Sequence, residues 1–454
     1  MSKLLIYNAR IVDHLTAHIG YVLIDGPMIA RVGYGEPPAE ITDMADSDTL
    51  DLNGRYLIPG LIDTHVHFRE PGMTSKADIA TESRAALAGG ITSFIDMPNT
   101  RPATTTLAQW QWKMERAATT SAANYAFFIG ATNNNMDLLR HLDYSRVAGV
   151  KLFMGSSTGG MLVDDDNTIT TLFSQVPALI AVHAEDEETI RRDTAAVMEA
   201  TAGNPDTGSH PLIRSTQACV KATRRALTLA RATGTRLHLC HISTAHEADL
   251  LRQMKQPGIT AETAPHYLHF TADDYPSRGN RIKCNPAIKG PSHRPELLKA
   301  LADGTIDSVA TDHAPHLLSE KQQPYISAPG GMPGVQHSLA VTIEALVDSG
   351  ICGDTDPVAL AVEKMAHNPA TIFAIRQRGF IREGYYADLA VVEHIPGGYT
   401  VLDDNAAGRC RWTPYAGDTF HYRVTATYVN GDPHPSPSAA MPLTFDHTQH
   451  TTPI

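Results

Sequence analysis

Two histidines follow an apolar run near residue 60, and this pattern constrains the fold more than any other feature of the chain. The run at residues 56–62 leads into His65-Val66-His67. Side chains two positions apart on a strand point to the same side, so both imidazoles can converge on one point from a single strand end. Two neutral imidazoles at one point form half of a metal site. The rest of the chain must therefore supply the other half.

Four further candidate ligands each close an apolar run of about strand length: Lys151, His183, His241 and Asp312. Helical patterns separate these runs. Three more runs, at residues 91–96, 124–129 and 259–264, have strand character without a ligand and bring the total to eight. Functional residues at the C-terminal ends of strands that alternate with helices are typical of a (β/α)8 barrel. We therefore expect an α/β fold with ligands on strands 1, 4, 5, 6 and 8.

The two ends of the chain show a different pattern from the middle. Residues 2–53 contain short alternating apolar runs with turns such as Asp25-Gly26, and similar runs return after residue 384. These are signals of β-hairpins. The predicted division is an N-terminal β part at 1–53, a barrel at 54–378 and a C-terminal β part with a tail at 379–454. The polar stretch from Asp432 is expected to be partly a loosely held tail.

The composition favours a cytoplasmic enzyme. A formal net charge of -12 argues against a nucleic-acid or anionic-membrane partner. The sequence has no secretory leader pattern and no apolar run long enough to cross a bilayer. The cysteines lack CxxC spacing, which predicts reduced thiols. They are Cys219, Cys240, Cys284, Cys352 and Cys410.

Seven motifs, taken in order, resemble those of the dihydroorotases of the amidohydrolase superfamily over nearly the whole chain. They are HVHFREPG at 65–72, DMPNT at 96–100, GVKLFM at 149–154, VHAE at 182–185, CHIS at 240–243, CNP at 284–286 and TDHAPH at 311–316. A single HxH is only moderately specific, whereas the ordered set is highly specific. The resemblance implies a barrel flanked by a small β-sandwich built from both chain ends.

The resemblance also implies a centre with two zinc ions. The ligands would be His65, His67 and Asp312 around the more buried ion, His183 and His241 around the second, and a carboxylated Lys151 between them. A lysine is costly to bury without a partner, so the alternative for Lys151 is an unmodified amine in an ion pair with Asp312 or Glu262. The ligand set would also accept manganese or cobalt.

The reaction implied is the reversible opening of L-dihydroorotate to N-carbamoyl-L-aspartate, a step of pyrimidine biosynthesis. Asp312 would take a proton from the attacking water and deliver it to the leaving nitrogen. Arg69 suits a bidentate contact with the substrate carboxylate. The resemblance gives further substrate contacts to Asn99, His316, Asn285, Gly330 and Gly331.

Each of the two charged pocket residues has a plainer interpretation. Arg69 could form a surface salt bridge with Glu70 or Asp78. His316 could be a solvated loop histidine. Two segments depart from the usual family pattern. Ala287-Ile288-Lys289 stands where the family often has a second proline and an arginine, and Gln336 stands where glutamate is common. These departures put the substrate loop in more doubt than the metal ligands.

Alternative functions are another cyclic amidohydrolase, such as an allantoinase or hydantoinase, and a non-catalytic scaffold. A ring without a carboxylate would have no use for Arg69, Asn99 and His316 together. A scaffold would be expected to have lost ligands, and here all are present. A homodimer is the expected assembly. His210, Arg214 and His313 lie near the motifs but receive no role.

Overall fold

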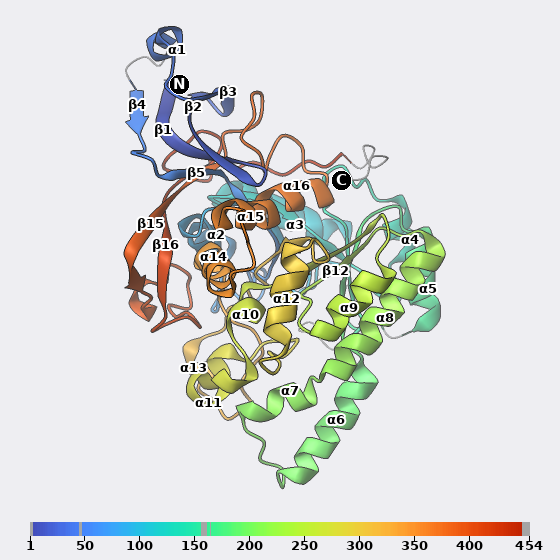
Figure 1. The fold of residues 1–454 in the computed structure, drawn as a ribbon. Coiled ribbons are helices and arrows are strands. Elements are labelled where there is room, and N and C mark those ends of the chain that lie inside the picture. The colour runs from blue at the N-terminus through green and yellow to red at the C-terminus, as the bar shows by residue number, and fades with distance from the viewer. Residues whose placement is uncertain (1–2, 45–47, 156–160, 164, 447–454) are drawn as a thin grey trace.

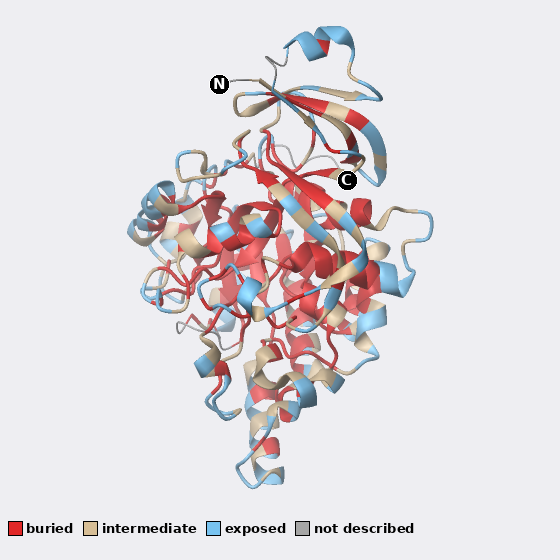
Figure 2. Cartoon of the chain, turned by 90° about the vertical axis from the view of Figure 1, so that its left-hand side faces the viewer, coloured by how far each residue is buried: buried red, intermediate tan, exposed pale blue. Residues whose placement is uncertain are grey.

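A barrel and a separate sheet from both chain ends make up the fold (Figure 1). The computed structural model describes residues 3–44, 48–155, 161–163 and 165–446. Figure 2 shows that buried residues concentrate in the barrel and along the inner part of the end sheet, while exposed residues line the outer helices and hairpins. The core is therefore centred on the barrel.

The barrel strands follow one another in chain order. They are β6 (Leu61–Val66), β7 (Ile91–Asp96), β8 (Asn124–Phe127) with β9 (Ile129–Gly130), β10 (Val150–Phe153), β11 (Ile180–His183), β12 (Leu237–Leu239), β13 (Ile259–Thr263) and β14 (Ser308–Val309). Every neighbouring pair is parallel. Because β8 pairs with β7 and β9 pairs with β10, one segment joins the two partial sheets. A parallel bridge between Val66 and His313 closes the ring. The predicted (β/α)8 barrel is confirmed.

Helices cover the outside of the barrel and connect its strands. The longer ones are α2 (Ile79–Ala88), α3 (Leu107–Thr120), α5 (Asp166–Gln175), α6 (Glu187–Ala200), α8 (Thr216–Thr233), α9 (Ala245–Met254), α12 (His293–Ala302) and α14 (Ser338–Ser349). Short helices are α1 (Ala39–Met44), α4 (Met136–His141), α7 (His210–Ile213), α10 (Pro265–His269), α11 (Tyr275–Arg278), α13 (Leu318–Lys321), α15 (Pro357–Val362) and α16 (Asn368–Ile372). None of the helices in the described ranges combines the length and apolar character that crossing a bilayer requires.

Local sequence signals explain where these helices begin and end. The Ser215 side chain accepts a hydrogen bond from Ala218 N and caps α8, which ends at Gly234 in a left-handed conformation with φ of 73°. Glycine adopts this conformation without steric cost, so it is a common helix terminator. Asp186 caps α6 through Thr189 N in the same way. The Asp186 cap fixes the loop that follows β11, whose last residue is a candidate ligand, and Gly234 ends α8 before β12 begins.

The end sheet combines strands from both termini. Its order is β16 (Thr419–Tyr428), β15 (Leu389–Thr400), β5 (Tyr56–Pro59), β1 (Lys3–Asp13), β2 (Thr16–Asp25) and β3 (Met28–Tyr34), with β4 (Asp48–Asp51) on β1. Ile24 and Ile29, near one edge of this order, share one apolar cluster with Leu389 and Val391, near the other. The sheet therefore curls around a common core, which gives it the two-layered character expected of a small sandwich.

Residues 56–59 were expected to begin the first barrel strand, but they form β5 of the end sheet. They pair with β1 on one side and with β15 on the other. The chain passes from the sheet into the barrel at Gly60, where an added Cβ would lie 2.2 Å from Thr92 Oγ1. Only glycine permits this close approach. In other respects the division at 1–53, 54–378 and 379–454 remains a prediction.

The stretch after Asp432 is held more firmly than its composition predicts. Leu443 and Phe445 are buried and join the apolar cluster at one end of the barrel interior. Backbone hydrogen bonds tie Leu443 N to Tyr125 O and Phe445 N to Ser145 O, each at 2.9 Å. Two apolar side chains are therefore enough to anchor a polar segment. The end of the predicted tail, from residue 447, lies outside the described residues.

Candidate active site

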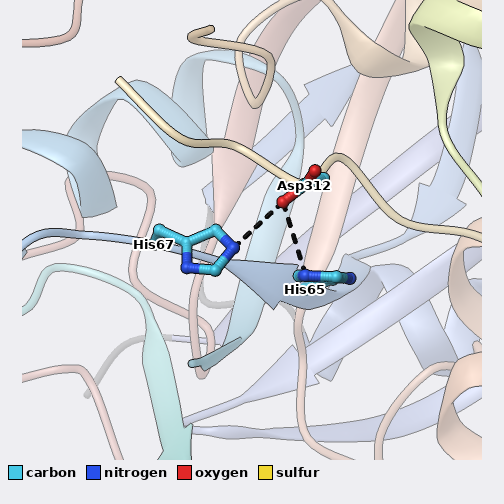
Figure 3. Close-up of side chains that lie close together, drawn as sticks. All are labelled: His65, His67 and Asp312. Carbon is cyan, nitrogen blue, oxygen red and sulfur yellow. Dashed lines mark hydrogen bonds and ion pairs between the residues drawn. The ribbon is translucent and has the colours of Figure 1, made fainter. Parts of the chain in front are cut away.

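Two histidines and an aspartate meet at one end of the barrel (Figure 3). His65 lies in β6, His67 directly follows it, and Asp312 lies just beyond β14. Asp312 Oδ1 is 3.0 Å from His67 Nε2 and 3.4 Å from His65 Nε2. One ligand atom of each residue lies within 4.8 Å of the others, which suits a single metal ion. The three residues that the sequence assigned to the more buried ion are thus brought together.

The loop carrying Asp312 is tied to β6 and to α2. Asp63 accepts hydrogen bonds from Thr311 Oγ1 at 2.6 Å and from Thr311 N at 3.1 Å. His313 Nε2 lies 2.9 Å from the buried carboxylate of Glu82. Asp312 itself has a positive φ of 48°, which is unfavourable for a residue with a side chain and persists only where neighbours enforce it. These contacts hold the carboxylate over the two histidines.

The hydrogen-bond partner of Nδ1 in each histidine determines which ring nitrogen carries the proton. His65 Nδ1 lies 2.5 Å from Glu262 Oε1, and His67 Nδ1 lies 2.7 Å from Asn99 Oδ1. Both partners accept, so each Nδ1 carries hydrogen and each Nε2 is directed at Asp312. Such outer partners orient metal-binding histidines and raise their basicity.

The electrostatics of this group favour an added positive charge. Burial and Lys151 lower the pKa of His65, but Glu262, Cys240 and Asp312 outweigh them and raise it to about 10. Burial lowers the pKa of His67 to about 4 against the opposing effect of Asp312. The extra proton on His65 thus offsets negative charge of the nearby carboxylates, Glu262 and Asp312. A divalent cation would take the place of that proton, because metal binding requires deprotonated ligands.

His183 and His241 form a second pair beside the first. His183 Nδ1 and His241 Nε2 are 2.8 Å apart, and the ring centroids of His241 and His65 are 5.4 Å apart. Burial lowers the pKa of both His183 and His241, which favours the neutral rings whose lone pairs can bind a metal. Two neutral imidazole nitrogens converging on one point fit a metal ion.

A buried carboxylate orients the second pair. Glu185 Oε2 lies 3.0 Å from His183 Nε2 and also accepts a hydrogen bond from Arg214. Burial opposes ionisation of Glu185, but Arg214 and His183 hold its pKa well below the usual range. Arg214, which received no role from the sequence, therefore supports the second histidine pair through Glu185.

Lys151 lies inside β10 and not at the end of a strand as expected. Gly149 has a φ of 153°, and β10 begins only at Val150. The amine is fully buried and donates to Cys240 Sγ at 2.9 Å. Of the ion-pair partners considered from the sequence, Glu262 binds His65 and His238 instead. No carboxylate of the described residues forms an ion pair with this amine, so the buried Lys151 fits conversion by carboxylation into an anionic carbamate.

Arg69 and His316 form a buried pair near the histidine–aspartate group, in the region where the resemblance places the substrate pocket. Arg69 Nε donates to Pro315 O at 3.1 Å, and its NH2 group lies 3.1 Å from His316 Nε2. Arg69 is 2% exposed and His316 is 4% exposed, so neither is a surface residue. Glu70 pairs with Arg116 instead of Arg69. The surface interpretations of both residues are therefore wrong.

The predicted substrate loop packs tightly against this pocket. Gly331 has a φ of 124°, and an added Cβ would lie 2.6 Å from Ala314 O. An added Cβ at Gly330 would lie 2.9 Å from Asn285 Nδ2. Asn285 Oδ1 lies 3.1 Å from His210 Nε2. Glycines at both positions therefore let the backbone approach Asn285 and the pocket closely.

A buried lysine, Lys321, binds the backbone of the same loop. Its ammonium donates to Lys283 O at 3.0 Å, Pro329 O at 2.8 Å and Gly331 O at 2.7 Å. Burial lowers the pKa of Lys321 to about 7. The residue thereby joins the segment carrying Asn285 to the segment carrying the two glycines.

Sequence reasoning missed several residues of this site because their roles depend on tertiary contacts. The sequence suggests Glu262 only as a partner of Lys151. Glu185 lies in the VHAE motif without an assigned role, and Lys321 lies in no motif. His266, which follows β13, is buried, and its Nε2 has no hydrogen-bond partner in the described ranges. A polar residue following a predicted strand could have signalled His266.

A parallel barrel with histidines and a carboxylate converging at the C-terminal strand ends defines a hydrolase of the metal-dependent type. The model of the amidohydrolase family matches residues 56–433. The chain therefore belongs to the amidohydrolase family and is a cyclic-amide hydrolase.

Individual relatives carry two names. An allantoinase from Bacillus velezensis is 34% identical over 411 residues, covering 89% of this chain and 87% of that protein. A dihydroorotase from Methanosarcina acetivorans is 32% identical over 431 residues, covering 92% and 89%. The solved L-hydantoinase of Arthrobacter aurescens is 25% identical with a TM-score of 0.89, covering 98% of this chain and all of that one.

Proposed function

We propose that this protein is a dihydroorotase that interconverts L-dihydroorotate and N-carbamoyl-L-aspartate. The observation that carries the proposal is the buried guanidinium of Arg69, which lies beside His316 and next to the histidine–aspartate group. No carboxylate of the described residues forms an ion pair with Arg69; a buried cation without such a partner is costly, and a substrate carboxylate would supply it. Among the ring substrates considered, dihydroorotate carries such a group.

The proposed metal ligands are His65, His67, Lys151, His183, His241 and Asp312, with zinc as the proposed metal and Lys151 carboxylated. When bound, two divalent cations would polarise the ring carbonyl and acidify the attacking water. The chain's own residues do the remaining work. Asp312 would accept the water proton and pass it to the leaving nitrogen. Arg69 and His316 would hold the carboxylate so that the scissile amide faces Asp312.

Asn99 has two roles in this proposal. Its oxygen accepts a hydrogen bond from His67 Nδ1, and it lies on the loop after β7. Its amide nitrogen remains a proposed donor to the carboxylate. Asn285 and the backbone at Gly330 and Gly331 are the proposed contacts to the pyrimidine ring.

Allantoinase is the second candidate, because allantoinases are among the relatives of this chain at 34% and 33% identity. Allantoin is uncharged and would leave Arg69 without a partner. The two candidates therefore differ in the charge that they place in the pocket.

The test is hydrolysis by purified protein of L-dihydroorotate, allantoin and hydantoin, each with and without a chelator. Chelator-sensitive turnover of L-dihydroorotate, well above that of the uncharged rings, is the expected result. Turnover of allantoin alone, with zinc supplied, would overturn the proposal in favour of the second candidate. Metal analysis and mass spectrometry of the active protein would test zinc and the added carboxyl group on Lys151.

A further inference from the structure

A second cation, Lys76, contacts the proposed carboxylate pocket. Lys76 lies in the loop between β6 and α2, and its Nζ is 3.0 Å from His316 Nδ1. It also pairs with Glu320 at 2.8 Å. The Lys76 side chain is 20% exposed and that of Glu320 is 32% exposed, so the pair lies at the rim of the pocket. His316 is thus placed between Lys76 on one side and Arg69 on the other.

The contact with Lys76 fixes which nitrogen of His316 carries the proton. An ammonium group can only donate, so Nδ1 must accept from Lys76. The hydrogen of the neutral ring then lies on Nε2, which can donate to Gly330 O at 3.1 Å. Burial together with the charges of Arg69, Lys76 and Lys321 holds the pKa of His316 far below its ordinary value, so the ring stays neutral.

This tautomer changes the meaning of the short distance between Arg69 and His316. The Arg69 NH2 group and His316 Nε2 are 3.1 Å apart, and both are donors. Two neighbouring donors cannot satisfy each other, and together they suit an oxygen anion that accepts from both. If the proton of His316 moved to Nδ1, Nε2 would accept from Arg69 and the donor pair would be lost.

We propose that Lys76 is a specificity-determining positioning residue, which keeps the hydrogen of His316 on Nε2, where Gly330 O and the substrate carboxylate can share it, and which adds positive charge to the pocket. This inference rests on the proposed function and deepens it. Among the described residues, Glu320 is the one carboxylate in a direct ion pair with either of the two cations, Arg69 and Lys76. The pocket therefore selects anionic rings over uncharged ones.

Three substitutions separate the two parts of this role. Lys76→Met removes both donor and charge, Lys76→Gln keeps a donor without charge, and Lys76→Arg keeps both. Lys221→Met, at a lysine on the exposed face of α8 that pairs with Asp186 and Glu188, is the matched control. The readouts are calorimetric binding of orotate to the zinc-loaded enzyme, and KM and kcat for L-dihydroorotate and hydantoin.

Lys76→Met should weaken orotate binding and raise KM for L-dihydroorotate by about 10- to 100-fold, the range of a charged hydrogen bond, with a smaller effect on kcat. KM for hydantoin should change by less than about threefold, as should all values for Lys221→Met. Lys76→Gln should fall between Lys76→Met and the wild type, and Lys76→Arg should lie closest to the wild type. Equal losses for charged and uncharged rings, or none, would overturn the inference.

A spectroscopic readout tests the tautomer without any substrate. In ¹⁵N-histidine spectra, His316, assigned by its loss in His316→Gln, should carry hydrogen on Nε2 in the wild type and on Nδ1 in Lys76→Met. An unchanged tautomer would contradict the role given to Lys76. Failure of the wild type to bind orotate or open L-dihydroorotate would instead contradict the proposed function, while the spectra would still decide the tautomer.

Discussion

The proposed metal-ligand group and the proposed substrate pocket lie side by side but are built in opposite ways. The ligand histidines stand in or just after barrel strands and are oriented by buried carboxylates, such as Glu262 behind His65 and Glu185 behind His183. The pocket is built from loops, and its charged groups are cations, Arg69 and Lys321, which bind backbone carbonyls. One side is arranged to receive positive charge and the other to receive negative charge.

This difference would allow the proposed metal and an anionic substrate to bind side by side without one occupying the place of the other. Carboxylates behind the histidines attract cations, while carbonyls around the pocket cations satisfy their hydrogen bonds but leave their net charge uncancelled. Substitutions in the metal-ligand group should therefore reduce metal binding and turnover. Substitutions in the pocket should instead reduce substrate affinity.

The largest effect is expected from Asp312→Asn, on the metal side. Loss of the proposed proton acceptor should reduce kcat by about 10³-fold or more, within reach of the usual contribution of acid–base catalysis. The amide oxygen can still face the histidines, so the zinc content should be retained. Steady-state kinetics with metal analysis checks this, and full activity would remove the proton-transfer role.

Next in size is Glu262→Gln, which weakens the outer partner of His65. Zinc affinity should fall by about 10- to 100-fold, as is typical when such a partner is changed. Chelator competition measures the effect. Glu247→Gln is the matched control, because Glu247 is a buried carboxylate that binds Thr223 and Thr244 instead of a proposed ligand. Equal affinities in the two variants would contradict the role of Glu262.

Arg69→Ala tests the pocket side. KM for L-dihydroorotate should rise by about 10- to 50-fold, since a charge-assisted contact is lost, while KM for hydantoin stays nearly constant. Arg423→Ala, in which the removed guanidinium is exposed and pairs with Glu393 on the end sheet, should leave both values unchanged. An equal rise for both rings would remove the carboxylate assignment of Arg69.

Gly331→Ala should give the smallest effect and acts on the loop that closes the pocket. A methyl group at a φ of 124° and 2.6 Å from Ala314 O should destabilise the fold by about 1–3 kcal/mol. Gly397→Ala, where no atom lies within 4 Å of the added Cβ, should stay within about 0.5 kcal/mol of the wild type. Chemical denaturation of both variants checks the difference, and equal stabilities would contradict the steric argument.

Sequence patterns predicted the barrel and brought its ligands to one end, because strand periodicity and order along the chain are local properties. They did not predict that residues 56–59 join the end sheet, since the partners of β5 come from distant β1 and β15. Nor did they reveal Glu262 as the partner of His65, because a buried glutamate on a strand has many candidate neighbours. The orientation of Asn99 toward His67 likewise depends on side-chain geometry that no spacing contains.

The packing of Leu443 and Phe445 has a consequence for how the chain folds as it is made. These two side chains complete the apolar cluster at one end of the barrel, with Ile62 and Ile95 from its first two strands. Both are translated long after β14, the last barrel strand. During synthesis the eight strands therefore emerge before this apolar cluster is complete. The barrel reaches its final packing only when residues 441–446 have left the ribosome.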